Sequence, residues 1–310
     1  MALLTTDMFG NRRDKVQTSI QRLRMFEPED GYFVADSGGK DSCTVKALCK
    51  MAGVKHDSHY HATTVDPPEL VRFIKAKHTD TEIQKPEHSM RELIIMKQFP
   101  PTRLMRYFCE HLKEAHGEGR VTVTGVRWAE SGNRKANQGI VTFYDKSEEL
   151  LEAADANGAD LSNAVRGGVI LNLDNDAGRR TVEMCYRTHK TIVNPIIDWT
   201  DEDVWEFIRA YNIPYCGLYD EGFKRLGCIG CPLGGFASMK REFKRWPVYK
   251  RLYIGAFDEM LEARKRSGKT NHSRLWTSGD GVFRWWIGED RGHDPNQITM
   301  EGLEKYENGE

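Results

Sequence analysis

The sequence predicts an α/β protein with a mostly parallel, doubly wound sheet, a cysteine-rich loop and a helical C-terminal extension. Short apolar runs typical of buried strands alternate with segments of helical periodicity over the first two thirds of the chain. One of these runs passes through two glycines directly into a helix pattern. Alternation of this kind favours parallel strands joined by helices that cover both faces of the sheet.

The strand, glycine turn and helix start lie between Tyr32 and Met51. An apolar run over 32–35 leads into Ser37–Ser42, here called the glycine loop, and helical spacing begins near Lys46. Glycines let backbone N–H groups approach an anion, and a helix N-terminus adds partial positive charge. The loop departs from the P-loop pattern of GTPases at Val34 and Asp41. The sequence therefore predicts a phosphate-binding loop, with an ordinary glycine turn as the alternative.

The remaining elements follow the same alternation. In chain order we expect a helix over 11–26, strands over 56–65 and 81–85, a helix from Pro101 through Leu112, strands over 121–126 and 191–197, and a helix after Thr200. Residues 139–183 have a weaker, acidic pattern and are interpreted as an insertion or lid with its own short helix. A cysteine-rich loop spans 216–235, and two further helices are expected at about 237–246 and 247–266. The predicted domains are 1–235 and 236–310.

Composition sets broad limits. The chain has 310 residues, a formal charge of −1 and 29% charged residues, so the total charge points to no polyanionic partner. It contains no apolar run of transmembrane length, and membrane association is not expected. Seven cysteines without a secretory signal favour a reducing compartment, with thiols that bind metal or react. The expected location is the cytoplasm.

A second motif leaves the strand at 121–126. It contains Arg127, Glu130 and Arg134, and arginine suits phosphate because its planar group donates two hydrogen bonds at once. Ligands of parallel sheets bind beyond the carboxyl ends of the strands, where both this loop and the glycine loop are expected. By itself the motif is equally compatible with a solvated, charged loop.

Three motifs together resemble the phosphoadenosine phosphosulfate (PAPS) reductase family of the PP-loop ATP pyrophosphatase superfamily. They are the glycine loop, Gly125–Ser131, and the Asn-Pro-Ile-Ile-Asp-Trp stretch over 194–199, and the resemblance covers roughly residues 30–235. It implies a site that binds ATP, or PAPS, and enzymes that cleave ATP between its α and β phosphates to adenylate an oxygen. The third motif would support the following helix. The nucleotide-binding residues implied are Ser37, Gly38, Gly39, Lys40, Asp41, Ser42, Asp66, Arg127, Glu130 and Arg134.

The cysteines form a second signal. Cys228 and Cys231 are two residues apart, a spacing that can hold one metal from a tight turn, and Cys185 and Cys216 complete a set of four. Cys109 is the reserve ligand. Four thiolates suit Zn²⁺ or a [4Fe–4S] cluster, and a redox pair or unrelated buried thiols is the alternative. The pattern is similar to the cluster-bearing ATP pyrophosphatase subunit of bacterial DNA phosphorothioation systems, which favours iron–sulfur.

The C-terminal extension is basic and aromatic. Between Lys240 and Arg274 there are eleven Lys or Arg and four Asp or Glu, a local net charge of +7, and aromatic residues are interleaved as far as Trp286. Cations neutralise phosphates and aromatic rings stack on bases, so DNA or RNA contact through 240–286 is one interpretation. The other is a helix with an aromatic core stripe and ordinary surface lysines.

These motifs are compatible with three alternative functions. The first is an ATP-dependent adenylylating enzyme that uses Mg²⁺ and serves sulfur transfer or DNA modification, with Lys40, Asp41 and Arg127 as catalytic residues. The second is a PAPS reductase that uses a thiol elsewhere, such as Cys109 or a thioredoxin-like partner. A sulfur-donor protein is the other expected protein partner. Such reductases carry a C-terminal cysteine motif, whereas no cysteine follows Cys231 here, which disfavours this activity. The third is a non-catalytic module that binds nucleotide and nucleic acid.

Overall fold

The computed structural model describes residues 3–6, 12–109, 111–112, 117, 119–143, 169–172, 191–271 and 273–289. They fall into two compact units, which are described separately. The sheet unit contains residues 1–60, 68–84 and 116–226, and the helical unit contains 61–67, 85–115 and 227–310. This division differs from the predicted boundary at 235, which stays a prediction. Within these described ranges, no helix is both long and apolar enough to cross a membrane.

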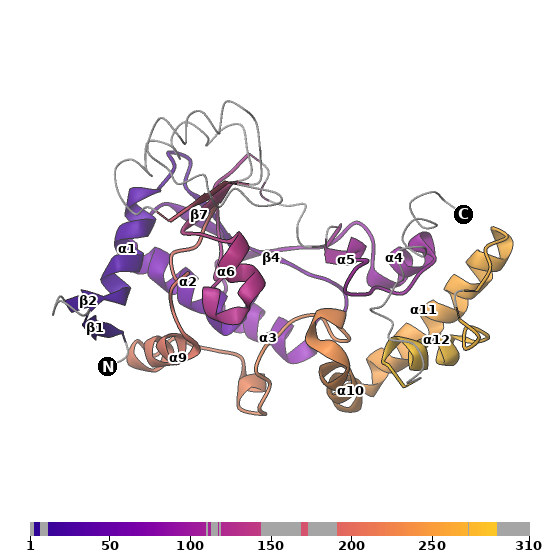
Figure 1. Ribbon diagram of the computed structural model, residues 1–310. Coiled ribbons are helices and arrows are strands. Elements are labelled where there is room, and N and C mark those ends of the chain that lie inside the picture. Colours follow the sequence, from indigo (N-terminus) through magenta and orange to yellow (C-terminus); the bar gives the residue numbers. More distant parts are fainter. Residues whose placement is uncertain are drawn as a thin grey trace. The chain divides into compact units, whose positions relative to one another are not determined.

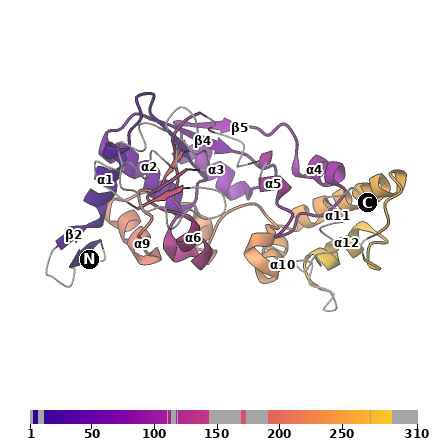
Figure 2. The ribbon, with the colours of Figure 1, turned by 45° about the horizontal axis from the view of Figure 1, so that its top comes forward.

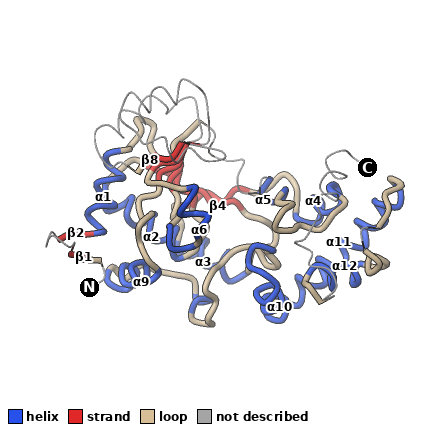
Figure 3. The backbone as a smooth tube through the Cα atoms, viewed as in Figure 1, coloured by secondary structure: helices blue, strands red, loops and turns tan. Residues whose placement is uncertain are grey.

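A seven-stranded sheet organises the sheet unit, and its strands are drawn in red in Figure 3. The strand order is β5-β4-β3-β6-β9-β7-β8. Its strands are β3 (Tyr32–Ala35), β4 (His56–His61), β5 (Thr81–Gln84), β6 (Thr122–Val123), β7 (Val141–Phe143), β8 (Val169–Leu171) and β9 (Thr191–Val193). β3 runs parallel to both β4 and β6, and β6 runs parallel to β9, which confirms the mostly parallel sheet. β4 and β5 form one edge of it (Figure 2).

The predicted insertion contributes to this sheet. β7 pairs antiparallel with β9 on one side and with β8 on the other, so two strands from within 139–183 extend the sheet. The inner positions of β7 are fully buried, and short apolar strands of this kind are hard to distinguish from loop by pattern alone. The short helix expected within 139–183 lies outside the described residues.

Helices cover the sheet. They are α1 (Lys15–Met25), α2 (Lys40–Ala52), α3 (Pro68–Lys77), α6 (Gly132–Asn137) and α9 (Asp201–Ala210), with 3₁₀ turns η2 (Trp128–Glu130) and η4 (Gly217–Tyr219). α1 packs against α2, and α2 packs against α9 (Figure 1). The Thr200 hydroxyl and the Asp203 carboxylate form a capping box that starts α9. A small hairpin of β1 (Leu4–Thr6) and β2 (Arg12–Asp14) precedes α1.

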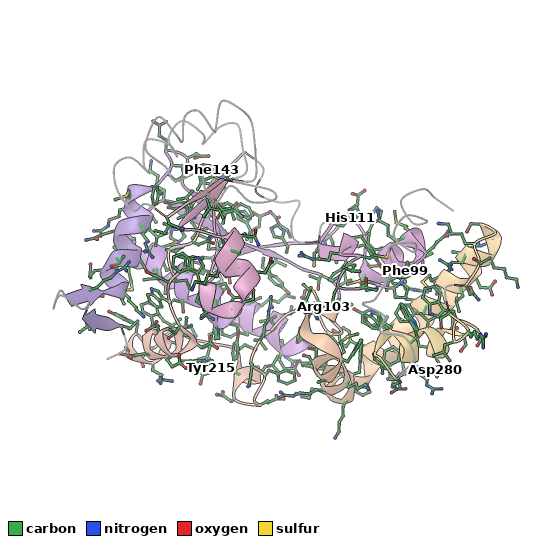
Figure 4. The ribbon with its side chains drawn as sticks, viewed as in Figure 1. Phe99, Arg103, His111, Phe143, Tyr215 and Asp280 are labelled. Atoms are coloured by element: carbon green, nitrogen blue, oxygen red, sulfur yellow. The ribbon has the colours of Figure 1, made fainter. Side chains whose placement is uncertain are left out.

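The helical unit has an aromatic core. Its elements are α4 (Met90–Lys97), α5 (Tyr107–Cys109), the 3₁₀ turn η5 (Pro232–Gly234), α10 (Gly235–Arg245), α11 (Pro247–Arg266) and α12 (Gly279–Trp286). α11 packs against both α4 and α12. Phe99, labelled in Figure 4, contacts the rings of Trp276 and Trp285, with ring centroids 5.2 and 6.1 Å apart. The two expected C-terminal helices are confirmed as α10 and α11.

The first half of the helix expected over 101–112 is wrong. Residues 101–106 form a turn in which the Thr102 hydroxyl accepts a hydrogen bond from the Met105 N–H, and helical structure begins only at α5 and is present again at 111–112. Leu104, assigned to the apolar face of that helix, is half exposed. Two consecutive prolines remove backbone donors at the start of the segment, and the Thr102 side chain offers the backbone a local alternative to the helix.

Candidate functional site

The glycine loop follows β3 and turns sharply at Gly38. This residue has φ +67°, and a Cβ there would lie 2.8 Å from the Leu70 and Ile74 side chains of α3. The Gly38 N–H donates to the Asp36 carboxylate at 3.1 Å. Both the left-handed backbone and the close approach of α3 therefore require glycine at this position.

Beyond the turn, the loop presents the start of α2. The Ser37 and Ser42 hydroxyls are 3.2 Å apart, and Ser42 also donates to the Gly39 carbonyl at 3.0 Å. Gly39 is the N-cap residue and offers no side chain to the first N–H groups of the helix. An uncapped helix start is an anion-binding feature because its donors and its dipole both favour negative charge.

One of the N–H groups at the start of α2 is hydrogen-bonded to a residue far away in the sequence. The Lys40 N–H donates to the Tyr219 hydroxyl at 2.9 Å. Tyr219 ends η4, and Trp205 and Tyr215 contact its ring edge-on, with centroids 5.2 and 6.4 Å away. Tyr215, in the segment after α9, is labelled in Figure 4.

Two cations and two carboxylates meet beside the loop. Lys40 Nζ lies 2.9 Å from Asp41 Oδ2 and 3.0 Å from Asp201 Oδ1. Arg127 donates from Nε to Asp41 at 2.8 Å and from Nη2 to Asp201 at 2.6 Å. Both cations are buried, whereas the Asp201 side chain is 63% exposed. Each carboxylate thus bridges the lysine and the arginine, and we call these four residues the charge quartet.

The charge quartet is electrically balanced. Burial alone would lower the pKa of Arg127, but the Asp41 and Asp201 carboxylates raise it above its usual range. Burial alone would raise the pKa of Asp201, but Lys40 and Arg127 lower it. Arg127 and Asp201 each stabilise the charged form of the other. A polyanion entering this site must either exchange places with the carboxylates or bring a cation with it.

The second and third sequence motifs hold Arg127 in place. A Cβ on Gly125 would lie 2.8 Å from the Asp41 backbone, so glycine allows the strand exit to approach α2. Arg127 Nη1 donates to the Trp199 carbonyl at 3.3 Å, and the Glu130 carboxylate accepts from the Arg127 N–H at 3.1 Å. Arg134 pairs with Glu130 at 3.2 Å. Glu130 therefore contacts Arg127 directly, whereas Arg134 contacts Glu130.

The third motif anchors this edge of the sheet to α1. The Asp198 carboxylate accepts two hydrogen bonds from Arg22, at 2.9 and 3.1 Å. Asn194 accepts from the Thr124 hydroxyl at 2.5 Å and donates to the Gly139 carbonyl at 2.8 Å. The expectation that this motif supports the following helix is too narrow, because it also fixes the loop that carries Arg127.

A buried polar network lies under the glycine loop. Asp36 accepts from His78 at 2.5 Å, from the Thr81 hydroxyl at 2.8 Å and from Lys46 at 3.3 Å. Burial favours the neutral acid, but the hydrogen bond to His78 and the His78 and Lys46 charges lower the pKa of Asp36 overall. Cys43 Sγ lies 3.7 Å from His78 Nε2, and burial raises the pKa of this thiol. The network holds the carboxylate that receives the Gly38 N–H.

The four predicted cysteine ligands do not all belong to one unit. Cys216 belongs to the sheet unit, Cys228 and Cys231 to the helical unit, and Cys185 lies outside the described residues. Cys228 and Cys231 form a tight turn closed by the Cys231 N–H and the Cys228 carbonyl at 3.2 Å, which suits two ligands of one metal. Over the described ranges, no three Cys, His, Asp or Glu side chains gather as a metal site. The four-thiolate site stays a prediction, as does the reserve role of Cys109, which is buried in the helical unit.

Asp66 follows β4 and also belongs to the helical unit. Its carboxylate accepts from the Thr63 N–H at 2.7 Å, and its carbonyl accepts from the Tyr249 hydroxyl at 3.0 Å. The neighbouring Val65 carbonyl accepts from the Ile229 N–H in the cysteine turn at 2.9 Å. These bonds give Asp66 a structural role in its loop, and its proposed contact with adenosine stays untested.

The basic extension separates into two faces. Its cations along α10 and the start of α11 are exposed: Lys240, Arg241, Lys244, Arg245, Lys250 and Arg251. Most of its aromatic rings are instead buried in the helical core, with Phe243, Trp246, Tyr253, Phe257, Phe283 and Trp286 each at most 7% exposed. These six rings are therefore core residues, and the stacking part of the nucleic-acid interpretation is wrong for them.

Sequence reasoning missed two residues at the loop. They are Asp201, in the first turn of α9, and Tyr219, at the end of η4. Both come from distant segments, 161 and 179 residues after Lys40, so no local spacing connects them to the loop. The available signal was the acidic first turn of α9, directly after the third motif.

The structure defines an α/β protein of nucleotide-binding fold, with a glycine-rich loop at the carboxyl end of a parallel strand. Comparison with protein families agrees: the phosphoadenosine phosphosulfate reductase domain matches residues 31–233. This chain belongs to that family.

Curated relatives share shorter segments. Adenosine 5'-phosphosulfate reductase of Neisseria meningitidis serogroup B is 31% identical over 106 residues, covering 31% of this chain and 42% of that protein. The Oceanobacillus iheyensis protein of the same name is 43% identical over 63 residues, covering 20% and 26%. An uncharacterised protein of Methanocaldococcus jannaschii is 37% identical over 91 residues, covering 29% and 20%. The matches thus span about a fifth to two fifths of these relatives.

Solved structures resemble the fold at low identity. A PAPS reductase of Candida auris with bound phosphate is 14% identical and has a TM-score of 0.41, covering 68% of this chain and 88% of that one. An FMN adenylyltransferase of Candida glabrata with FAD and pyrophosphate is 13% identical and has a TM-score of 0.42, covering 95% and 81%. At these scores we draw no functional argument from either.

Proposed function

We propose that this protein is an enzyme that binds Mg²⁺·ATP at the glycine loop and cleaves it between the α and β phosphates, transferring the adenylyl group to an acceptor. The charge quartet carries the proposal. A site for a bare anion would need only Lys40 and Arg127, but here Asp41 and Asp201 stand beside them. Mg²⁺ is commonly held by one or two carboxylates together with substrate phosphates, and two carboxylates at a phosphate loop fit that pattern.

In this proposal the chain acts by positioning and electrostatics. The N–H groups at the start of α2 and the Ser37 and Ser42 hydroxyls hold the β and γ phosphates. Lys40 and Arg127 stabilise the negative charge that builds on pyrophosphate as it leaves the α phosphorus. Asp41 and Asp201 would hold Mg²⁺, which neutralises phosphate charge when bound. The oxygen of the acceptor attacks the α phosphorus, so no residue of the chain needs to form a covalent bond.

The second candidate is sulfonucleotide reduction. The curated relatives named above favour it, because two of the three are adenosine 5'-phosphosulfate reductases. The same loop would hold the phosphate and sulfate of the nucleotide, and an external thiol from a thioredoxin-like protein would attack the sulfur. Against it, residues 232–310 of this chain contain no cysteine.

A parallel product assay tests the two. The full chain is incubated with Mg²⁺·ATP and, separately, with adenosine phosphosulfate or PAPS plus reduced thioredoxin. Pyrophosphate from ATP is the result we expect. Sulfite from a sulfonucleotide, without pyrophosphate from ATP, would replace our proposal with the reductase. Nucleotide binding without either product would leave a non-catalytic module. Because the acceptor is not known, the ATP assay includes hydroxylamine as a trapping nucleophile.

We also propose a [4Fe–4S] cluster held by Cys185, Cys216, Cys228 and Cys231, with Zn²⁺ as the alternative. The tight turn at Cys228 and Cys231 supports two of the four ligands. Iron and sulfide analysis of protein purified without oxygen tests this: about four irons per chain, lost in Cys231→Ser, is expected. One zinc and no iron would make the thiolates structural. Sulfur transfer to DNA, as in the phosphorothioation systems, is the pathway that a cluster would favour, and the comparisons add no support for it.

Nucleic acid remains a proposed partner through the exposed cations of α10 and α11. Between Lys240 and Phe257 the only acidic residue is Glu242, which accepts hydrogen bonds from the Gly230 N–H and the Ser238 hydroxyl, at 2.7 and 2.8 Å. The face is therefore strongly positive and suits phosphates without base stacking. Salt-dependent binding of duplex DNA that weakens in Lys244→Ala/Arg245→Ala would support it, and binding unchanged by this double substitution would exclude this face.

A further inference from the structure

We propose that the Tyr219 hydroxyl occupies the position of a phosphate or sulfate oxygen in the glycine loop, and that nucleotide binding displaces it. This inference rests on the proposed use of the loop as an anion site and adds a residue that competes for it. The starting observation is the 2.9 Å hydrogen bond from the Lys40 N–H to Tyr219 Oη, at the first residue of α2.

The position of the hydroxyl is that of a ligand atom. An ideal Cβ on Gly39 would lie 3.5 Å from Tyr219 Oη, so the oxygen sits directly against the backbone of the loop. Lys40 is the residue after the N-cap, and its N–H is one of the helix-start donors that an anion would use. An N–H···O bond places the acceptor about 2.9 Å from the nitrogen along the N–H direction, and two oxygens cannot share that place. An anion that uses this donor must therefore displace the tyrosine.

The Tyr219 side chain is held by one hydrogen bond from the loop and by contacts within a small aromatic group. Burial raises the pKa of its phenol, so the hydroxyl is neutral and makes a weaker acceptor than an anion. The residue lies at the end of the three-residue turn η4 and is only partly buried. Its ring contacts Trp205 and Tyr215; Tyr215 is exposed, and Trp205 is partly buried and packs against the core of the sheet unit. Displacement costs one neutral hydrogen bond and a rearrangement of this aromatic group.

The same turn connects the loop to Cys216. The Tyr219 N–H donates to the Cys216 carbonyl at 3.1 Å, and Cys216 is the N-cap of η4. Movement of Tyr219 thus acts on the backbone that carries a predicted metal ligand. Within the sheet unit, η4 is a short physical connection between the anion loop and this cysteine.

The aromatic group supplies the readout. Trp205 contacts Tyr219 edge-on at 5.2 Å between centroids, so departure of the phenol changes the surroundings of the indole. Titration of the full chain with inorganic pyrophosphate is therefore expected to change its tryptophan fluorescence. The change should be lost in Trp205→Phe, while calorimetry still detects binding by that variant.

The decisive variant is Tyr219→Phe, which removes the hydroxyl and keeps the ring. Because one competing neutral hydrogen bond is lost, pyrophosphate and ATP should bind about two- to tenfold more tightly. Tyr215→Phe is the matched control: its hydroxyl bonds to Asp220 at 3.1 Å and not to the loop, so its affinity should equal that of the wild type. Thermal unfolding establishes that both variants are folded.

Two results would overturn the inference. Weaker binding by Tyr219→Phe would mean that the hydroxyl donates to the bound anion, and equal binding would mean that it does not compete. If either accompanies pyrophosphate release from ATP, the inference fails while the proposed function stands. If wild type and Tyr219→Phe both fail to bind pyrophosphate and ATP, the loop is not an anion site and both proposals fail.

Discussion

The two compact units of this chain both bury aromatic rings, but they differ in how much charge they bury. The sheet unit buries charge around its loop: Asp36, Lys40, Lys46 and Arg127 are each at most 5% exposed. The most deeply buried large side chains of the helical unit are aromatic, including Trp276, Trp286, Phe257 and Phe283 at 0–1% exposure. Burying charge is expensive even when it is paired, whereas buried aromatic area stabilises a fold directly. The buried charge of the sheet unit is consistent with the proposed ligand site, whereas burial in the helical unit is mainly aromatic and apolar.

The largest effect should come from the aromatic core. Trp286 contacts the rings of Tyr253 and Phe257 at 4.7 and 5.3 Å and donates to the Pro101 carbonyl at 2.6 Å. Trp286→Ala should lower the free energy of unfolding by about 3–5 kcal/mol, because it leaves a cavity. Leu252→Ala, at an exposed position of α11, is the control with little expected effect. Denaturant unfolding measures both, and a loss below about 1 kcal/mol for Trp286→Ala would contradict an aromatic core.

The second prediction concerns Lys40. Lys40→Ala should reduce pyrophosphate release from ATP by at least about 100-fold, because charge on the leaving group loses a buried cation. Its melting temperature should change little, since Asp41 and Asp201 keep Arg127 as a partner and reach solvent. Lys50→Ala, on the same helix with a side chain 55% exposed, is the control. If Lys40→Ala lowered the melting temperature but left the rate of pyrophosphate release unchanged, Lys40 would stabilise the fold and would not act in catalysis.

The third and smallest prediction is a pH dependence. The folded-state pKa of Asp36 is lowered from 3.8, so its stabilisation is present above about pH 4 and is lost as pH falls through the lower folded value. Asp36→Asn should therefore cost about 1.5–3 kcal/mol at pH 7, and the difference from wild type should shrink towards pH 3. Urea unfolding at several pH values measures this. A difference that is constant from pH 7 to pH 3 would show that the carboxylate charge of Asp36 is not what stabilises the network.

The sequence predicted the parts of the site that lie within one continuous motif or at the end of a neighbouring strand. The glycine loop and its helix form one continuous stretch, and Arg127 leaves a neighbouring strand, so parallel-sheet geometry brings the two together. The structure confirms this by the Arg127–Asp41 contact at 2.8 Å. Gly125 belongs to the same motif, but its role in admitting the Asp41 backbone is visible only in three dimensions.

What could not be predicted depends on distant segments or on competing local preferences. Tyr219 and Asp201 reach Lys40 across more than 160 residues, and only Asp201, in the acidic first turn of α9, has a local signal. Helical spacing after Pro101 was outweighed by the turn at Thr102. The aromatic residues of the basic extension had two interpretations, and burial decides for the core. Hydrophobic pattern alone cannot tell an aromatic core from a stacking surface.

The most direct test of the central claim is calorimetric titration of the full chain with inorganic pyrophosphate in the presence of Mg²⁺, for wild type and Lys40→Ala. The account predicts one site per chain in the wild type and affinity at least tenfold weaker in the variant, because Lys40 is a buried cation at the loop. Equal affinity in the two proteins would place the anion elsewhere. The glycine loop would then no longer be the functional site.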